Sequence, residues 1–242
     1  MSSKKYKNKI CVYCRESIAS TADHVFPREI FQEHQRGNLP KVPACKSCNN
    51  EKSRLEHYLL SVLPFGATHG NAHQALSVDV IRRLERNRKL HRKIKAGFGY
   101  SYIPRQSKIL EKRLSITLNS NALHDFVGYV ARGLMWHHCE RLLPLDCTFR
   151  AFTPSPRGLD HVTALFALNS PHRVQVNLGE NTVRYKGVMS EVDEGVSVWA
   201  VQLFGGITLS TRNHSHIFEN SFVAVITGKP SILNKLEFEN GI

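Results

Sequence analysis

Residues 45–52 read CKSCNNEK, and residues 11–14 read CVYC. Each CxxC turn presents two thiolates to one ion, and two such turns suit a tetrahedral zinc site. We therefore expect a structural Zn²⁺ held by four cysteines, which are Cys11, Cys14, Cys45 and Cys48. A site of four thiolates is coordinatively closed, so any catalysis must come from other residues.

Composition excludes disorder and membrane insertion. The 242-residue chain carries 33 Lys and Arg against 20 Asp and Glu, a formal net charge of +13, and 41% of its residues are hydrophobic. This content supports a core for one large domain or two small ones. No apolar run approaches the roughly 20 residues that cross a bilayer, and the N-terminal stretch lacks the apolar segment of a secretory signal. We expect a soluble, cytoplasmic protein with no membrane association.

Thirty residues separate the two cysteine pairs, which is more than a zinc ribbon uses, so a small structured insert is expected between them. The alternatives are four unrelated buried thiols or a redox-active CxxC pair. Disulfides are rare inside cells, and nothing near either pair reads as a thioredoxin-like βαβ unit. These considerations favour zinc.

The positive charge is concentrated in the first half of the chain. Residues 1–118 hold 23 basic and 9 acidic residues, a net charge of +14, whereas residues 119–242 have a net charge of −1. This asymmetry predicts a polyanionic partner for the N-terminal half, with nucleic acid as the leading candidate. The alternative is a surface that is merely basic.

Polar side chains suited to phosphodiester chemistry lie in and beside the insert. Asp23 and His24 open the stretch DHVFP, Asn38 lies in GNLP, and Asn49 directly follows Cys48. Cleavage of a phosphodiester needs an aligned water, a group that accepts its proton and positive charge at the leaving oxygen. Imidazole titrates near neutral pH, and carboxylate and amide oxygens are ligands for Mg²⁺.

The order of these residues within the zinc frame resembles the HNH endonuclease family, whose ββα-metal core is often braced by such a pair of CxxC turns. The resemblance implies that His24 is the general base and that Asp23 and Asn49 hold one catalytic divalent ion. By the same analogy, Asn38 hydrogen-bonds the loop that orients the His24 ring. Lys52 would neutralise a phosphate oxygen, with an exposed helix lysine as the alternative interpretation.

The resemblance covers residues 8–60 and implies Mg²⁺, or alternatively Mn²⁺ or Ni²⁺, and products with a 5′ phosphate and a 3′ hydroxyl. Two features depart from the family pattern. Asn49 stands where the family pattern has its closing histidine, which makes the motif an HNN variant. The amide oxygen of Asn49 still suits a hard cation. The stretch NLPKVPAC, residues 38–45, is longer than the pattern, which puts the role of Asn38 in doubt.

Apolar spacing predicts helices on the C-terminal side of the second cysteine pair. One helix is expected to be capped by Asn49 or Asn50 and to end at Pro64 and Gly66. Residues 64–74 read as a loop, and residues 75–95 as a second, strongly basic helix. We expect backbone contacts with DNA from this helix, with a solvated face as the alternative. The assigned cations are Arg82, Arg83, Arg86, Arg88, Lys89, Arg92 and Lys93.

Three aromatic residues, Phe98, Tyr100 and Tyr102, follow in a Gly-containing stretch interpreted as a loop. Core packing is the favoured explanation for them, and stacking on bases or wedging a groove is the alternative.

The last part of the chain reads as a separate unit. A helix capped by Ser120 or Asn121 is expected first, followed by strands joined by turns at residues 178–181 and 205–206. The expected strands are residues 161–168, 173–178, 182–189, 196–204, 207–211 and 222–227.

The predicted fold class is therefore α+β, in three parts. Residues 1–66 form a zinc-braced, treble-clef-like ββα-metal module, and residues 67–118 form a basic helical extension. Residues 119–242 form a mainly antiparallel sheet with a covering helix and no assigned role.

The resulting hypothesis is a metal-dependent HNH DNA endonuclease or nickase. The stretch KVPACKSCNNEKSRLEHYLLSVLPFG, residues 41–66, also resembles HNH effectors attached to bacterial antiphage systems, including Zorya-type ones. This second resemblance implies antiviral defence, with protein partners of a defence system bound through the C-terminal domain. The competing hypotheses are a non-catalytic zinc module that binds nucleic acid or a protein partner, and an RNA nuclease.

Overall fold

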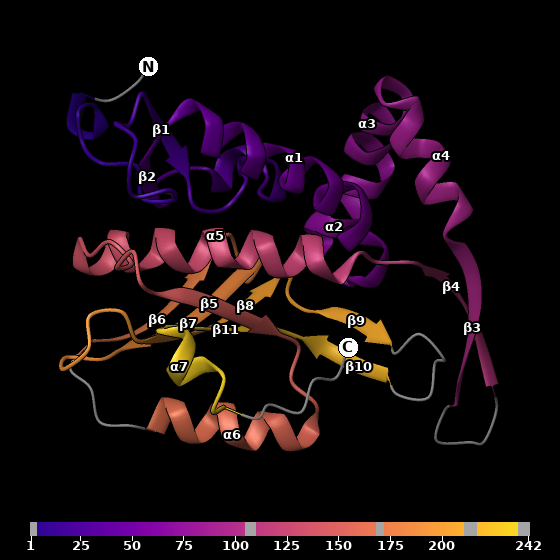
Figure 1. Cartoon of the computed structure of the whole chain (residues 1–242). Coiled ribbons are helices and arrows are strands. Elements are labelled where there is room, and N and C mark those ends of the chain that lie inside the picture. Colours follow the sequence, from indigo (N-terminus) through magenta and orange to yellow (C-terminus); the bar gives the residue numbers. More distant parts are fainter. Residues whose placement is uncertain (1–3, 105–109, 168–171, 211–216, 237–242) are drawn as a thin grey trace.

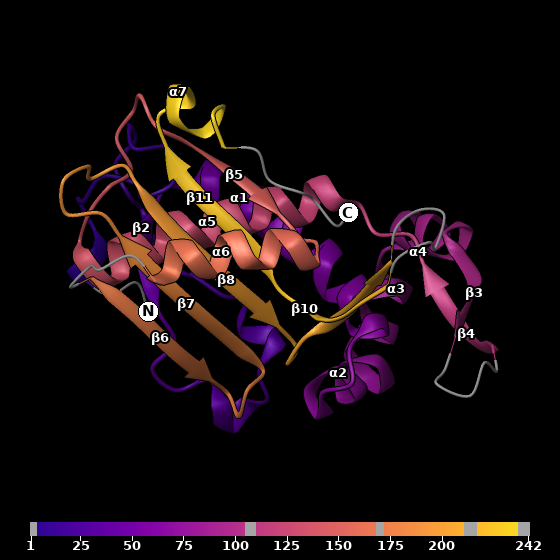
Figure 2. The same cartoon turned by 90° about the horizontal axis from the view of Figure 1, so that it is seen from below.

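The computed structural model describes residues 4–104, 110–167, 172–210 and 217–236. Its elements lie in layers (Figure 1). The N-terminal segment, residues 4–62, packs on one side of the long helix α5 (Ser120–Cys139), and a five-stranded sheet lies on the other side. A further helix, α6 (Pro156–Ala167), crosses the outer face of that sheet (Figure 2). The prediction of mixed helix and sheet is confirmed.

The N-terminal segment contains a short hairpin followed by a helix. Strand β1 (Thr21–His24) pairs antiparallel with β2 (Lys41–Ala44), and helix α1 (Lys46–Val62) follows β2 directly. Three 3-10 turns also belong to this segment: η1 (Lys4–Tyr6), η2 (Arg28–Ile30) and η3 (Glu33–Gln35).

Helix α1 begins earlier than predicted. Its N-cap is Cys45, in an extended conformation, so the expectation that Asn49 or Asn50 caps it is wrong. The second CxxC turn is itself the start of the helix, which places Cys48 and Asn49 in the first turn. The predicted end is close to the observed one, because the 3-10 turn η4 (Leu63–Gly66), which contains Pro64, replaces the α-helix there.

The basic extension is broken into pieces. Asn87, at φ −121° and ψ 78°, interrupts the helix predicted over residues 75–95, and its side chain accepts a hydrogen bond from the Leu90 amide. Helical structure also begins at Gly70, inside the predicted loop. The observed elements are α2 (Gly70–Gln74), the π-helical turn η5 (Ala75–Asp79), α3 (Val80–Arg86) and α4 (Arg88–Ala96).

The aromatic stretch after α4 is a strand and not a loop, which corrects the prediction. Strand β3 (Phe98–Pro104) pairs antiparallel with β4 (Leu110–Ile116) as a separate two-stranded ladder. Both figures show this hairpin projecting from the body of the molecule.

The large sheet has the order β5-β11-β8-β7-β6, and every neighbouring pair is antiparallel, as predicted. Four of its strands coincide with predicted ones. Its members are β5 (Thr148–Phe152), β6 (Arg173–Leu178), β7 (Val183–Met189), β8 (Ser197–Leu203) and β11 (Val223–Gly228). A short helix, α7 (Pro230–Leu233), follows β11.

Two predictions within this part are wrong. Residues 161–167 lie in helix α6, because Val162, Leu165 and Phe166 recur with helical spacing and pack on Phe152 and its neighbours. The turn at residues 205–206 does not join paired strands: β9 (Ile207–Ser210) pairs with β10 (Ile217–Ser221) in a small separate sheet. The ends of two predicted strands, residues 168 and 211, lie outside the described residues.

Residues 1–66 and 119–242, which the sequence suggested as separate units, share one hydrophobic core. The Phe26 and Tyr185 ring centroids are 5.5 Å apart. A Cβ atom built on Gly133 of α5 would lie 2.9 Å from Val25, so the absence of a side chain there permits close packing of α5 on the N-terminal segment. Within the described residues, no helix combines the length and apolar character of a membrane span.

Candidate functional site

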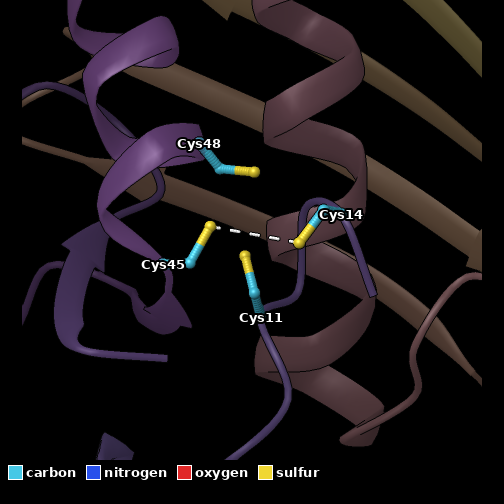
Figure 3. Close-up of side chains that lie close together, drawn as sticks. All are labelled: Cys11, Cys14, Cys45 and Cys48. Atoms are coloured by element: carbon cyan, nitrogen blue, oxygen red, sulfur yellow. Dashed lines mark hydrogen bonds between the residues drawn. The ribbon is translucent and has the colours of Figure 1, made fainter. Parts of the chain in front are cut away.

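Four cysteine thiols converge where the first CxxC turn meets the start of α1 (Figure 3). All four sulfur atoms lie within 4.8 Å of one another, and Cys14 Sγ is 3.9 Å from Cys45 Sγ. Tetrahedral zinc with bonds of about 2.3 Å places its sulfur ligands about 3.8 Å apart. The donor set and its spacing therefore fit the structural Zn²⁺ expected at Cys11, Cys14, Cys45 and Cys48.

The frame around the thiols comes from three parts of the chain. The Val12 amide donates to the Pro43 carbonyl at 3.0 Å, which attaches the first CxxC turn to β2. The Arg15 guanidinium donates to the carbonyls of Pro144, at 2.6 Å, and Cys147, at 3.2 Å, which attaches the same turn to the segment after α5. The sulfur cluster is thus held against both the hairpin and the C-terminal part.

The thiols differ in acidity. Burial acts to raise the pKa of Cys14, but hydrogen bonds from the Glu16 and Ser17 amides lower that pKa to about 6. Burial raises the pKa of Cys11 and of Cys48 above the ordinary thiol value. Zinc binds thiolates, so loading of the site displaces protons from these two buried thiols.

A buried charge cluster lies beside the four cysteines. The side chain of Lys52 on α1 has no exposed surface, and its Nζ atom lies 3.0 Å from Asp23 Oδ2 and 2.5 Å from Glu56 Oε1. The same ammonium donates to the His24 carbonyl oxygen at 2.7 Å. Lys52 therefore cannot contact a phosphate in this arrangement, which corrects the sequence expectation. Lys52 instead fixes the position of the His24 carbonyl group through this hydrogen bond.

The carboxylate of Asp23 is shared between two donors. The Tyr13 hydroxyl, from within the first CxxC turn, donates to Asp23 Oδ2 at 2.6 Å. Burial, followed by the negative charge of Asp23, raises the pKa of Tyr13 well above its ordinary value, so the hydroxyl remains a donor. Burial also raises the pKa of Glu56, against the opposing effect of Lys52. The sequence reasoning missed Tyr13 and Glu56, although Glu56 stands four residues after Lys52 on one helix face.

Three polar groups of the predicted site residues have no hydrogen-bond partner in the part of the chain that the structure describes. They are the His24 ring, the Asn49 side-chain amide and Asp23 Oδ1. His24 and Asn49 are half-buried. Asn49 lies three residues before Lys52, on the same side of α1 as the Lys52–Asp23 ion pair.

The electrostatic surroundings of His24 are positive. Burial, and then the charges of Lys41 and Arg28, lower the pKa of His24 to about 4, although Asp23 opposes the shift. The imidazole is therefore neutral at pH 7, and its lowered pKa makes it a weaker base than an ordinary histidine. Lys41 stands directly opposite His24 in the β1–β2 ladder.

Asn38 does not have the role that the resemblance implies. It is exposed, with a left-handed φ of 56°, and its side chain makes no hydrogen bond to any described residue. The backbone after His24 is held instead by the Val25 amide, which donates to the Pro40 carbonyl at 2.9 Å. Asn tolerates the left-handed region better than most residues, which accounts for its presence in this turn.

Among the cations assigned to the basic extension, Arg83 is not on the surface. Arg83 is buried, its Nη2 atom lies 2.6 Å from Glu29 Oε2, and its Nη1 atom donates to the Leu60 carbonyl at 2.9 Å. The expected DNA contact by Arg83 is therefore wrong, because this residue anchors α3 to the segment just after His24. The remaining assigned cations are exposed: Arg82, Arg86, Arg88, Lys89, Arg92 and Lys93.

Comparison with known proteins provides no relative for this arrangement. No family model, no curated protein and no solved structure matches the chain.

Proposed function

We propose that the protein is a metal-dependent DNA endonuclease or nickase of the HNH type, with His24 as its general base. The observation that supports this most is the selective use of polar groups beside the cysteine cluster. Lys52 and Tyr13 fix one oxygen of Asp23 and the backbone of His24, while the His24 ring, Asp23 Oδ1 and the Asn49 amide carry no partner among the described residues. In the proposed site these three groups meet the divalent ion and the attacking water.

In the proposed reaction, the neutral His24 ring accepts a proton from the attacking water. The Asp23 and Asn49 oxygens suit a hard cation such as Mg²⁺, with Mn²⁺ or Ni²⁺ as alternatives. When bound, that ion supplies Lewis-acid charge at the departing 3′ oxygen. The exposed side chains of Lys41 and Arg28 beside His24 attract the phosphate, and the exposed cations of α3 and α4 add affinity without sequence preference.

The proposal extends to a role as an effector of bacterial antiphage defence, with protein partners bound through the C-terminal part. It rests on the resemblance of residues 41–66 alone.

A plasmid-nicking assay tests the catalytic role. Supercoiled plasmid is incubated with Mg²⁺, or without added metal ion, and with wild type, His24→Ala or the control His34→Ala, an exposed histidine of the same insert. We expect His24→Ala to lower the nicking rate by about 100-fold or more, since that is the usual contribution of a general base. His34→Ala should nick at the wild-type rate. Equal nicking by His24→Ala and wild type would reject the assignment.

A zinc-stabilised binding module without catalysis is the second candidate. It is favoured by the full engagement of Asp23 Oδ2 with Tyr13 and Lys52, since such a cluster can serve stability alone. This candidate predicts DNA binding that is independent of added metal ion and no cleavage with Mg²⁺, Mn²⁺ or Ni²⁺. Duplex RNA offered in parallel with duplex DNA distinguishes an RNA nuclease from a DNA nuclease.

A further inference from the structure

The hairpin of β3 and β4 stands apart from the rest of the fold. Its two strands pair only with each other in the described part of the chain. A two-stranded hairpin is marginally stable by itself, and native proteins normally cover its apolar side chains. Among the described side chains of this hairpin, Phe98, Tyr100, Tyr102 and Leu114 are exposed.

Aromatic side chains gather on one face of the hairpin. Residues of a strand alternate between its faces, so Phe98, Tyr100 and Tyr102 share one side, with Leu114 opposite Tyr100 and Lys112 opposite Tyr102. We call these five residues the aromatic face. Tyr100 is 61% exposed and Tyr102 57% exposed, so the expectation that they pack in the core is wrong. The Phe98 ring contacts the Phe65 ring, with the two centroids 5.5 Å apart.

The aromatic face borders a groove. This groove has a volume of about 930 Å³, and its walls include the base of the hairpin, η4 and β9. Phe98, Tyr100 and Leu114 belong to its lining, so an occupant of the groove would meet the aromatic face directly.

Positive charge lies on the hairpin itself and on the helix that precedes it in the chain. Helix α4 leads into β3 through Gly97 alone, and it contains no acidic residue. The ammonium of Lys112 lies 4.0 Å from the centre of the Tyr100 ring. The exposed cations of α4 are Arg88, Lys89, Arg92, Lys93 and Lys95. A ligand that combines flat apolar surfaces with negative charge would match both features.

We propose that the aromatic face stacks on unpaired bases of a DNA strand whose phosphates contact Lys112 and the cations of α4. Base stacking on aromatic side chains, beside a positively charged track for the backbone, is how single strands are bound without sequence preference. In an intact duplex the flat faces of the bases already stack on each other, so this surface distinguishes unpaired from paired DNA. The choice of DNA rests on the proposed nuclease function, but stacking itself does not require cleavage.

Fluorescence anisotropy of a labelled oligonucleotide of roughly 16 nucleotides, the upper end of single-strand site sizes, tests this inference. The full chain is titrated against the single strand and against the blunt duplex, without added Mg²⁺. The double variant Tyr100→Ala/Tyr102→Ala should bind the single strand about tenfold or more weakly, since each stacked base contributes substantially to affinity. Its affinity for the duplex should change by less than about twofold.

The matched control is Tyr100→Phe/Tyr102→Phe, which keeps both rings and should retain single-strand affinity. The inference would be overturned if the alanine double variant bound the single strand as tightly as wild type does. It would also be overturned if the variant lost equal affinity for the single strand and for the duplex. Tighter binding of the same sequence as RNA would overturn the assignment to DNA. Loss of single-strand affinity in a protein that nicks no plasmid would support the stacking surface and reject the nuclease. A protein that nicks plasmid, and whose single-strand affinity does not change in Tyr100→Ala/Tyr102→Ala, would support the nuclease and reject the stacking surface.

Discussion

Lys52 connects two carboxylates and the carbonyl oxygen of His24 although its own side chain has no exposed surface. An unpaired ammonium is strongly unfavourable in such a place, so Asp23 and Glu56 are needed to balance it. The converse also holds, because both carboxylates are largely removed from water. The local geometry at His24 therefore depends on a residue that itself meets no substrate.

The substitution Lys52→Met tests this dependence. It leaves Asp23 and Glu56 close together without a counter-charge, and we expect the free energy of unfolding to fall by about 3–5 kcal/mol. Urea denaturation followed by circular dichroism measures the change. The control is Lys46→Met, an exposed lysine on the same helix, which should change stability by less than about 0.5 kcal/mol. Equal stability of the two variants would show that the buried cluster contributes nothing.

The elements around the cysteines are short. Strands β1 and β2 have four residues each, and a two-stranded ladder of this size is not stable alone. Helix α1 begins at Cys45 without a side-chain cap. The thiols join the first turn of this helix to the CxxC turn that β2 holds, so a zinc ion bound by them would contribute directly to the folding of this segment.

Removal of zinc should therefore destabilise this segment first. In a protein of this size, loss of about 1 kcal/mol lowers Tm by roughly 2–4 °C, so we expect a fall of at least about 10 °C for Cys45→Ser or after treatment with a strong chelator. Differential scanning calorimetry, with zinc content measured in parallel, checks this. Cys139→Ser, outside the sulfur cluster, should retain one zinc per chain and nearly the wild-type Tm. A zinc-free Cys45→Ser protein with unchanged Tm would contradict the structural role.

The whole molecule is organised around α5. This helix packs against α1 on one side and against the large sheet on the other, so the N-terminal and C-terminal parts bury a common set of apolar residues. Val25 and Phe26, directly after His24, lie in that shared core with no exposed surface. The segment that carries His24 thus packs on residues more than a hundred positions away in the chain.

It follows that residues 1–66 should not fold as an isolated module. The fragment retains all four cysteines and should bind Zn²⁺, but Val25, Phe26 and their neighbours would be left in water. We expect a zinc-loaded fragment with no cooperative thermal transition, whereas the full chain unfolds cooperatively. Near-ultraviolet circular dichroism during heating distinguishes the two. A sharp transition in the fragment would indicate an independent domain.

The amino-acid sequence by itself determined what depends on short range. The spacing within the CxxC turns predicted the sulfur cluster, and strand-like apolar runs between turn residues predicted β6, β7, β8 and β11. The helix of residues 161–167 was missed because a short apolar run does not distinguish helix from strand. The break at Asn87 was missed because the apolar stripe continues across it.

Only the tertiary structure decided which charged residues are internal. Lys52 and Arg83 read as surface cations, but their partners Asp23 and Glu29 lie far away in the chain, 54 residues in the case of Arg83 and Glu29. The exposure of Tyr100 and Tyr102 is decided in the same way, because apolar character alone does not tell whether another element covers a strand. Burial is a property of what packs against a side chain, and those contacts form only when distant segments meet.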